Sequence, residues 1–326
     1  MESSILKPSI LVARAIFPET LARLSEHFEV ESNQVDHIFT PQELAAKLQG
    51  KHGLLCTGSA RVDATQLAQT PMLRAVANMA VGYDNLDLAA CTAHQVMATN
   101  TPDVLNQTTA DFAWALLMAT ARRVTEAEHW LRAGNWEKWS YDAFLGADIH
   151  GATLGILGMG RIGQAIARRS SGFDMQVLYH NRSRLSESQE AYANNARYVS
   201  KQELLATADH LVLILPYSAQ THHAIGAPEL AMMKPSATLV NVARGGIVDD
   251  AALIAALRQK KIAAAGLDVF EGEPKFHPDF LTLENVVLTP HIASASESTR
   301  RAMAECAADN LIAALTHQKP PNLLNP

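Results

Sequence analysis

The chain alternates short apolar runs with segments of helical periodicity, and it does so in two separate series. This alternation predicts βαβ units, in which parallel strands are covered by helices. The first series extends from Ser9 to Thr101, and the second begins at Thr153. A chain of 326 residues is long enough for two domains, each with its own core. We therefore predict an α/β protein with two doubly wound parallel sheets.

Short apolar runs mark the strands of both series, and apolar positions at helical spacing mark the helices. In the first series the predicted strands are Ile10–Ala13, Gly53–Cys56, Leu73–Ala77 and Val96–Ala98. The predicted helices of this series are Pro18–Phe28, Pro41–Gln49 and Leu86–His94. In the second series the predicted strands are Thr153–Leu157, Met175–His180, His210–Leu215, Thr238–Val242, Ala263–Asp268 and Val286–Leu288.

Two further helices are predicted outside the two series. Between Thr101 and Arg123, apolar residues follow one another almost without interruption, which predicts a helix buried between two domains. The segment from about Glu297 to Thr316 has helical spacing and could pack on either domain. The polar segment Asn181–Asn195 is predicted to be a surface excursion.

Charge and cysteine content exclude several classes of protein. The 27 basic and 33 acidic side chains give a net charge of −6, so no general positive field attracts nucleic acid or anionic lipid. Three distant cysteines without a CxxC pair favour neither a disulfide framework nor a zinc site. No apolar run approaches the roughly 20 residues that cross a bilayer, and no signal peptide is recognisable. We expect a soluble cytoplasmic protein that binds small molecules or copies of itself, and no metal.

A glycine motif links the first strand of the second series to the helical pattern after it. Gly158, Gly160 and Gly163 form G-x-G-x-x-G. In such a motif the first glycine permits a tight turn, the second lets the backbone approach a pyrophosphate, and the third allows close packing of helix and strand. The helix N-terminus then faces the phosphates, so dinucleotide binding is favoured over a purely structural turn. The other predicted contacts in this turn are Met159, Arg161 and Ile162.

The end of the following strand indicates which dinucleotide is bound. NAD sites usually have Asp or Glu about 20 residues after the glycines, whereas this chain has His180-Asn181-Arg182-Ser183-Arg184. Arg182 and Arg184 can pair with the 2′-phosphate of NADP. We therefore predict NADPH as the cofactor, with NAD less favoured, and Asn181, Arg182 and Ser183 among its contacts. The alternative is that the arginines merely lie on a solvated loop.

Three further segments place a polar group just after an apolar strand. They are Val240–Gly246 with Arg244, Gly266–Pro274 with Glu273, and Leu288–Ile292 with His291. Singly, each has an ordinary interpretation: a solvated turn arginine, a loop charge beside a proline, and one of 13 histidines. Together they supply a guanidinium, a carboxylate and an imidazole.

In this order and spacing, after the glycine motif, the segments resemble the D-isomer-specific 2-hydroxyacid dehydrogenase family. The resemblance covers nearly the whole chain, from the strand at Leu73 through Ala80–Asp87 to Pro290–Ile292. Within the family, the chain looks most like the bacterial glyoxylate/hydroxypyruvate reductases, which are also called 2-ketogluconate reductases. The segments that carry this narrower resemblance are Thr120–Val124, Ala265–Glu271 and Asn325-Pro326.

The resemblance implies a flavodoxin-like substrate domain of residues 1–101 and 293–326 and a Rossmann cofactor domain of residues 102–292. The active site would lie in the cleft between them, and two chains would form a homodimer through their cofactor domains. Backbone N–H groups of Val81 and Gly82 would bind the substrate carboxylate, and Asp268 would lie near the nicotinamide. The other residues implied to line the cofactor site are Leu215, Pro216, Thr221, Val242, Ala243, Arg244 and His291.

The implied activity is the NADPH-dependent reduction of a small 2-keto acid to a D-2-hydroxy acid. Glyoxylate, hydroxypyruvate and 2-ketogluconate all remain candidate substrates. Arg244 would hold the carboxylate and carbonyl of the substrate. Protonated His291 would donate a proton to the ketone oxygen, and Glu273 would stabilise the imidazolium and orient its ring. The alternatives are an NAD-preferring or phosphoglycerate-type dehydrogenase and, more remotely, an NAD(H)-sensing corepressor that works by binding a partner.

Overall fold

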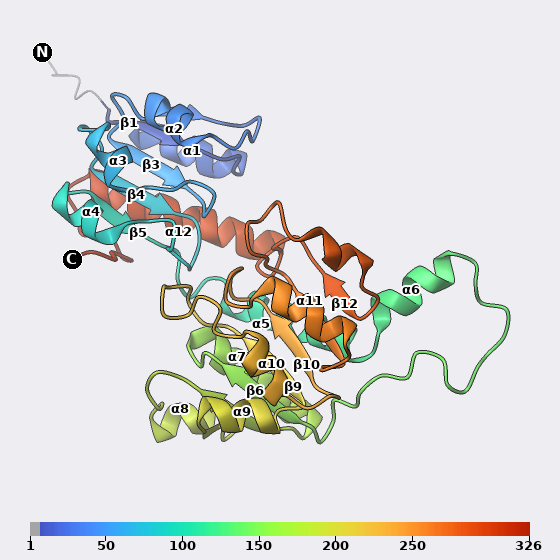
Figure 1. The fold of residues 1–326 in the computed structure, drawn as a ribbon. Helices are drawn as coiled ribbons and strands as arrows, with labels where there is room; N and C mark the ends of the chain where they lie inside the picture. The colour runs from blue at the N-terminus through green and yellow to red at the C-terminus, as the bar shows by residue number, and fades with distance from the viewer. Residues whose placement is uncertain (1–6) are drawn as a thin grey trace, which may run out of the picture. The chain divides into compact units, whose positions relative to one another are not determined.

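The computed structural model describes residues 7–326 and divides the chain into two compact units (Figure 1). Unit 1 contains the described part of Met1–Leu105 together with Ala295–Pro326, and unit 2 is Asn106–Ser294. Unit 1 is therefore assembled from both ends of the described chain, whereas unit 2 is continuous. The first six residues of the predicted substrate domain lie outside the described residues.

Unit 1 is built on a five-stranded parallel sheet with the order β2-β1-β3-β4-β5. This is the flavodoxin-like order, which confirms the predicted doubly wound sheet. The strands are β1 (Ser9–Val12), β2 (Glu29–Ser32), β3 (Gly53–Cys56), β4 (Ala75–Asn78) and β5 (Met97–Thr99). The helices are α1 (Pro18–His27), α2 (Pro41–Lys47), α3 (Ala64–Ala68), α4 (Leu88–Ala93) and α12 (Glu297–Leu315).

Burial explains which strands of unit 1 have a clear sequence pattern. Every residue of β3 and β4 is buried, as expected for central parallel strands covered on both faces. Strand β2 lies at the sheet edge with Glu29 and Ser32 exposed. It therefore lacks the apolar run of a central strand, and the prediction omits it. The short helix α3 is also absent from the prediction.

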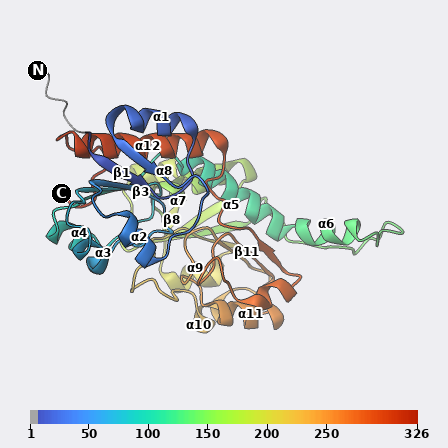
Figure 2. The same cartoon turned by 90° about the horizontal axis from the view of Figure 1, so that it is seen from above.

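Helix α12 packs on the sheet of unit 1. The sequence leaves open which of the two domains this helix packs on. It contacts β3, β4 and α1, and Figure 2 shows α12 and α1 side by side. A Cβ atom on Gly53 would lie 2.8 Å from a methyl carbon of Leu315, so this glycine allows the helix to approach the sheet. Buried Asn310 fastens the helix to the chain around it, since its side chain donates to the Asn100 carbonyl at 3.0 Å.

Unit 2 is built on a seven-stranded parallel sheet with the order β12-β11-β10-β9-β6-β7-β8. The strands are β6 (Thr153–Leu157), β7 (Gln176–His180), β8 (Arg197–Tyr198), β9 (His210–Leu213), β10 (Thr238–Asn241), β11 (Ala264–Leu267) and β12 (Val286–Leu288). The α-helices are α5 (Asn106–Ala121), α6 (Val124–Arg132), α7 (Arg161–Arg169), α8 (Glu187–Tyr192), α9 (Lys201–Thr207), α10 (Ala227–Met232) and α11 (Asp250–Arg258). Two 3₁₀ turns are η1 (Ser170–Phe173) and η2 (Pro278–Thr282).

The strand order reverses between β6 and β9, as in a Rossmann sheet, and confirms the second predicted doubly wound sheet. All six predicted strands are present. The edge strand β8 and helix α8 are absent from the prediction, and α8 lies within the predicted surface excursion over Asn181–Asn195, most of whose residues are exposed. The predicted helix over Thr101–Arg123 is α5, which begins later because Asp103 has a φ of +70°, outside the helical region.

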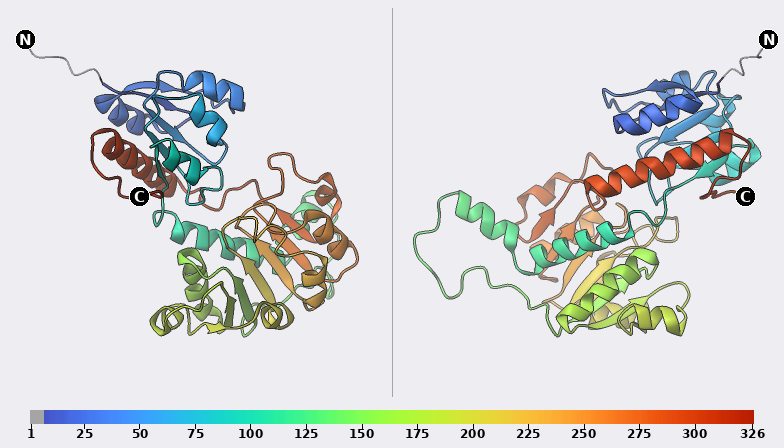
Figure 3. Two further views of the ribbon diagram at one scale, coloured as in Figure 1. Left: turned by 60° about the vertical axis from the view of Figure 1, so that its left-hand side comes forward. Right: turned by 180° about the vertical axis from the view of Figure 1, so that it is seen from behind.

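Helix α5 is a buried element of unit 2 and packs against α7, β10 and β11. After it, α6 and the irregular residues 133–147 form an arm that extends away from the sheet of unit 2 (Figures 1 and 3). The arm returns to the end of α5, where the Ala147 N–H donates to the Ala121 carbonyl at 2.9 Å. Within residues 7–326, no helix combines the length and apolar character needed to cross a bilayer.

The close contact between α5 and β11 can be tested by adding a side chain at Gly266 in β11. A Cβ on Gly266 would lie 2.4 Å from Thr120 Oγ1 and 2.9 Å from Leu116 Cγ. We expect Gly266→Ala to lower the free energy of unfolding by about 1–3 kcal/mol, the typical cost of overpacking a core. Urea denaturation measures this change. Gly172→Ala is the control, since a Cβ there meets no atom within 4 Å, and equal stability of the two variants would contradict the packing argument.

Candidate active site

The carboxyl ends of the central strands of unit 2 meet at one edge of its sheet. Strands β6, β9, β10, β11 and β12 are parallel neighbours and pair in register up to their last residues. In sheets of this kind, ligands bind just beyond the carboxyl ends of the strands. The segments that start at this edge carry the glycine turn, Arg244, Asp268, Glu273 and His291.

Two of the three motif glycines are required by the chain's own packing. Gly158 has a φ of +102°, and a Cβ there would lie 2.5 Å from the Ile214 carbonyl oxygen. A Cβ on Gly163 would lie 2.4 Å from the Gly158 carbonyl oxygen. A Cβ on Gly160, in contrast, would meet no atom within 4 Å. Protein packing alone therefore does not explain Gly160, which leaves open space beside the backbone.

Helix α7 begins directly after this open space. Its N-cap is Gly160, so no side chain caps the helix, and its first turn contains no acidic residue. The partial positive charge of the helix N-terminus is therefore not balanced by the helix's own side chains. This arrangement fits the pyrophosphate of a dinucleotide. Of the other predicted contacts, Met159 is buried, while Arg161 is exposed and Ile162 half-buried at the start of the helix.

The end of β7 is tied to the glycine turn. Asn181 Oδ1 accepts a hydrogen bond from the Met159 N–H at 3.0 Å. Arg182 and Ser183 follow, and both are exposed. Within residues 7–326, neither side chain has a hydrogen-bond or ion-pair partner. Both are therefore available to a ligand that occupies the glycine turn.

Arg184 differs from Arg182. Its guanidinium makes two parallel hydrogen bonds to Glu190 of α8, each 2.9 Å long. The prediction that both arginines pair with a 2′-phosphate therefore does not match the structure for Arg184. The sequence alone does not predict this role of Glu190. The pairing with Arg184 depends on α8, and the polar composition of this segment does not indicate a helix.

The segment after β9 adjoins the glycine turn. A Cβ on Gly158 would also lie 2.8 Å from the backbone nitrogen of Leu215. The predicted contacts Pro216 and Thr221 enclose a tight turn, because Thr221 Oγ1 donates to the Pro216 carbonyl at 2.8 Å and accepts from the Ser218 N–H at 2.8 Å. This turn brings Leu215, Pro216 and Thr221 to the same edge of the sheet as the glycines.

The segment after β10 is folded around the side chain of Asn241. This buried amide accepts from the Ala243 N–H at 3.0 Å and donates to the Arg244 carbonyl at 3.1 Å. Val242 and Ala243 are buried, and Arg244 is half-buried. The guanidinium of Arg244 donates to the Ala243 carbonyl at 2.8 Å. Asn241 therefore determines the backbone conformation from which Arg244 projects.

Sequence reasoning missed the roles of Asn241 and Gly245. An asparagine that closes a turn directly after a strand is a recognisable signal, but the prediction uses this segment only for its arginine. A Cβ on Gly245 would lie 1.8 Å from the Phe270 carbonyl oxygen. Gly245 thus lets the backbone that follows Arg244 pass directly against the segment that leads to Glu273.

Asp268 is completely buried, and its carboxylate holds the turn after β12. It accepts hydrogen bonds from Thr289 Oγ1 at 2.7 Å, from the Ile292 N–H at 2.8 Å and from the Ala293 N–H at 2.9 Å. Burial raises the pKa of Asp268 above its ordinary value, although these donors oppose the effect. The His291 N–H also donates to the Asp268 carbonyl at 2.9 Å. Asp268 therefore positions the segment that carries His291.

His291 and Glu273 form a close pair at this edge. His291 has a φ of +55°, a conformation that is uncommon for a residue with a side chain and typical of functional sites. Its Nδ1 lies 2.6 Å from Glu273 Oε1, while Glu273 Oε2 accepts from the Phe270 N–H at 3.3 Å. The ring is exposed, and its Nε2 bonds to no residue between 7 and 326.

The charges around Glu273 keep it ionised. Burial raises its pKa, but the hydrogen bond with His291 and the positive charges of His291 and Arg244 outweigh burial, so the pKa lies below its ordinary value. Arg244 lies on the neighbouring segment, which passes directly against this one, since a Cβ on Gly245 would lie 1.8 Å from the Phe270 carbonyl oxygen. The structure therefore brings all three predicted catalytic side chains to one edge of unit 2.

Val81 and Gly82 belong to unit 1, in the segment after β4. The Gly82 carbonyl accepts from Asn78 Nδ2 at 2.9 Å, and the Val81 carbonyl accepts from Asn100 Nδ2 at 2.8 Å. Both residues are half-buried. Within residues 7–326, their N–H groups have no hydrogen-bond acceptor. The two buried asparagines thus fix this backbone through its carbonyl groups and leave its N–H groups for a ligand.

A group of metal-ligand residue types lies beside the site. Potential ligand atoms of His222, His223 and Glu271 are within 4.8 Å of one another. They already contact neighbours, since His223 Nε2 lies 3.0 Å from Glu271 Oε2 and His222 Nδ1 lies 3.2 Å from the Tyr217 hydroxyl. The contact between His223 and Glu271 fastens the turn after β9 to the segment that carries Glu273.

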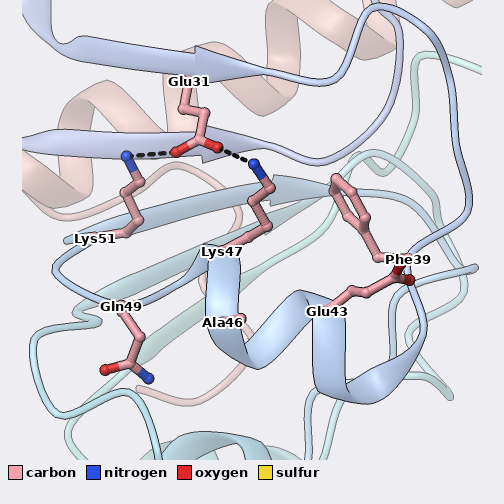
Figure 4. A pocket seen from close by; sticks show the side chains of 7 residues that line it. All are labelled: Glu31, Phe39, Glu43, Ala46, Lys47, Gln49 and Lys51. Atoms are coloured by element: carbon pink, nitrogen blue, oxygen red, sulfur yellow. Dashed lines mark hydrogen bonds and ion pairs between the residues drawn. The ribbon is translucent and has the colours of Figure 1, made fainter.

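A hollow on unit 1, shown in Figure 4, lies over β2 and α2. Its charged groups neutralise one another, because Glu31 pairs with Lys47 at 2.8 Å and with Lys51 at 2.9 Å. The two lysines lower the pKa of Glu31. The hollow therefore presents a balanced set of charges, in contrast to the edge of unit 2.

The chain is similar to known proteins over most of its length. A family model described as the NAD binding domain of D-isomer specific 2-hydroxyacid dehydrogenases matches residues 114–293. A glyoxylate reductase of Thermococcus onnurineus is 47% identical over 324 residues, which cover 98% of this chain and 96% of the relative. A glyoxylate reductase of Aeropyrum pernix is 45% identical over 325 residues, with the same coverage.

A solved structure has the same architecture. It is the NADPH-dependent glyoxylate/hydroxypyruvate reductase of Sinorhizobium meliloti in complex with NADP and malonate. Its TM-score to this chain is 0.87, with 36% sequence identity, and the alignment covers 98% of this chain and 97% of that chain.

The segment that carries Glu273 generates a prediction about pH. Asp250, at the start of α11, accepts from the Glu271 N–H at 3.3 Å, and burial raises the pKa of Asp250 to about 6. Since the folded state binds this proton more tightly than the unfolded state, the raised pKa destabilises the fold above about pH 6 and has no such effect below the ordinary pKa of 3.8.

We therefore expect Asp250→Asn to be more stable than the wild type above about pH 6, and this difference to shrink as the pH falls toward 3.8. Thermal unfolding of both proteins across this range measures the difference. A stability difference that stays constant with pH would contradict the assignment.

Proposed function

The chain belongs to the D-isomer specific 2-hydroxyacid dehydrogenase family, and we propose that it reduces small 2-keto acids to D-2-hydroxy acids with NADPH. The observation that carries this proposal is that the segments with Arg244, Glu273 and His291 leave the same edge of the sheet as the glycine turn, with His291 paired to Glu273. The relatives named glyoxylate reductase and glyoxylate/hydroxypyruvate reductase support these two substrates first, and 2-ketogluconate is a third candidate.

The reaction requires a proton donor and a group that stabilises negative charge on the ketone oxygen. The bound cofactor supplies the hydride to the ketone carbon. Protonated His291 donates from Nε2 to the ketone oxygen, while Glu273 at Nδ1 stabilises the imidazolium and fixes the ring. Arg244 binds the carboxylate and polarises the carbonyl. In unit 1, the N–H groups of Val81 and Gly82 are proposed to bind a carboxylate.

Residues of unit 2 hold the cofactor. The open space at Gly160 and the uncapped N-terminus of α7 accept the pyrophosphate. Asn181 supports this turn through its bond to Met159, and the exposed Arg182 and Ser183 bind the 2′-phosphate of NADP. The contacts on the nicotinamide side are Leu215, Pro216, Thr221, Val242, Ala243, Arg244 and His291, with Asp268 fixing the backbone beneath them.

A second copy of the chain is the proposed macromolecular partner. The arm of residues 124–147 exposes Leu131, Trp136, Trp139, Tyr141 and Leu145. A set of large apolar side chains on a segment that projects from its unit is typical of a protein interface. We propose that the arm joins two chains into a homodimer through unit 2.

The role of His291 has a direct kinetic test. We expect His291→Ala to lower kcat for glyoxylate reduction by about 10²-fold or more, the scale of general acid catalysis. The dissociation constant of NADPH should change little, because most contacts to the cofactor, including those to its phosphates, are made by other residues. The oxidation of NADPH measured by absorbance gives kcat, and fluorescence titration gives the dissociation constant.

His94→Ala is the control, since this histidine is exposed just after the end of α4 in unit 1. A His291→Ala variant with the turnover of the wild type would exclude His291 as the proton donor. A wild type that reduces none of the three candidate acids would refute the proposed activity.

Cofactor preference depends on Arg182. We expect the wild type to have a higher kcat/KM with NADPH than with NADH, and Arg182→Ala to reduce the NADPH value by about tenfold or more, as for a lost hydrogen bond to a charged group. The NADH value should be unaffected, because NADH has no 2′-phosphate. Equal loss with both cofactors would show that Arg182 supports the loop without reading the phosphate.

A further inference from the structure

The segment after β7 is anchored on both sides of Arg182 and Ser183. On one side, Asn181 is tied to the glycine turn through Met159, and its carbonyl accepts from the Tyr198 hydroxyl at 3.2 Å. On the other side, the Leu185 N–H donates to the hydroxyl of Tyr179, which lies within β7 itself, at 2.9 Å. Only a short stretch of exposed residues lies between the two anchors.

The second anchor is a closed network of three side chains. The Tyr179 hydroxyl donates to Glu190 Oε1 at 2.6 Å, and the same oxygen accepts from Arg184 Nε at 2.9 Å. Arg184 Nη2 donates to the other carboxylate oxygen at 2.9 Å. Tyr179 is completely buried and Glu190 is 8% exposed. This network connects a core strand, the loop after it and helix α8.

The charge states of this network are constant over the pH range in which enzymes work. The bonds from Arg184 and Tyr179 lower the pKa of Glu190 to about 2. Burial and the bond to Glu190 raise the pKa of Tyr179 to about 12. A carboxylate that would otherwise repel a phosphate is thus paired with a guanidinium.

We propose that Tyr179, Glu190 and Arg184 are positioning residues for cofactor specificity, which hold the loop so that Arg182 and Ser183 face the 2′-phosphate of NADP. Arg184 contributes to phosphate binding by neutralising Glu190, and it does not contact the phosphate. This inference rests on the NADPH preference proposed above and adds the residues that shape the phosphate site.

A direct role for Arg184 would predict the opposite response to one substitution. If Arg184 left Glu190 to bind the phosphate, Glu190→Gln would release the guanidinium and strengthen the binding of 2′-phosphorylated ligands. If the network positions the loop, Glu190→Gln weakens the anchor, because a neutral amide binds a guanidinium less strongly than a carboxylate does. The sign of the change therefore separates the two roles.

The experiment measures the binding of two adenosine ligands by calorimetry. Adenosine 2′,5′-bisphosphate carries the 2′-phosphate, and adenosine 5′-monophosphate lacks it, so neither ligand depends on catalysis. We expect Glu190→Gln and Arg184→Met each to weaken binding of the bisphosphate by about tenfold, the effect of weakening a hydrogen bond to a charged group. Binding of the monophosphate should be unchanged in both variants.

Arg197→Met is the matched control, because Arg197 forms an exposed ion pair with Glu203 at 2.9 Å in the same unit. It should bind both ligands as the wild type does. Tyr179→Phe removes only the hydroxyl, and we expect it to lower the preference for the bisphosphate in the same direction. Thermal unfolding of each variant shows whether unit 2 remains folded, and Arg184 is exposed enough to be replaced without disturbing the core.

The outcomes separate this inference from the proposed function. If the wild type binds both ligands with equal affinity, and Arg182→Ala does so too, the proposed NADPH preference is refuted. This inference is then refuted with it. A wild type that prefers the bisphosphate through Arg182, while Glu190→Gln keeps or increases the preference, refutes the positioning network alone. Equal weakening of both ligands in Arg184→Met would assign the network a general structural role and also overturn the inference.

Discussion

The carboxylate of Asp268 is the interaction on which the geometry of the site depends. A buried carboxylate is costly unless its oxygens receive hydrogen bonds, and here all three donors to it belong to the turn that carries His291. Asp268 can therefore be buried only when this turn has the observed conformation, with His291 in the left-handed region. Asp268 directly follows β11. Its hydrogen bonds to the turn therefore fix the position of the His291 imidazole relative to the sheet. The pairing of His291 with Glu273 then needs only a side-chain contact between neighbouring segments.

Close backbone contacts bring the glycine turn and the segment with Arg244 to the same edge of the unit 2 sheet as His291. The turn after β6 touches the segment after β9 at Gly158, and the segment after β10 touches the one after β11 at Gly245. Neither contact has room for a side chain. The charged residues near these contacts consequently come from adjacent strands and not from one continuous segment. Catalysis by preorganised charge needs such fixed positions, because groups that must first be ordered lose part of their effect to entropy.

Much of this arrangement could be predicted because it depends on local patterns. Continuous apolar runs identify the central strands, and the spacing of Gly158, Gly160 and Gly163 identifies the turn. The polar edge strands β2 and β8 lack such runs and were missed. Arg182 and Arg184 cannot be told apart in the sequence, since Arg184 differs by its pairing with Glu190 of α8, which also accepts from the Tyr179 hydroxyl. The function of Asp268 was also hidden, because two of its donors are backbone N–H groups, which every residue except proline possesses.

The origin of unit 1 from both ends of the described chain affects how the protein folds during synthesis. Domains usually fold in the order in which they are made, beginning at the N-terminus. Here α12 follows every other described element in the sequence, and it covers the apolar surface formed by Leu55, Ala75 and Ala77 with residues such as Ala307 and Leu311. Unit 2, although second in the sequence, is complete while that surface of unit 1 is still bare. During most of its translation, a nascent chain therefore has an uncovered hydrophobic sheet face in unit 1. In chains that stop before Glu297, this hydrophobic face stays exposed permanently.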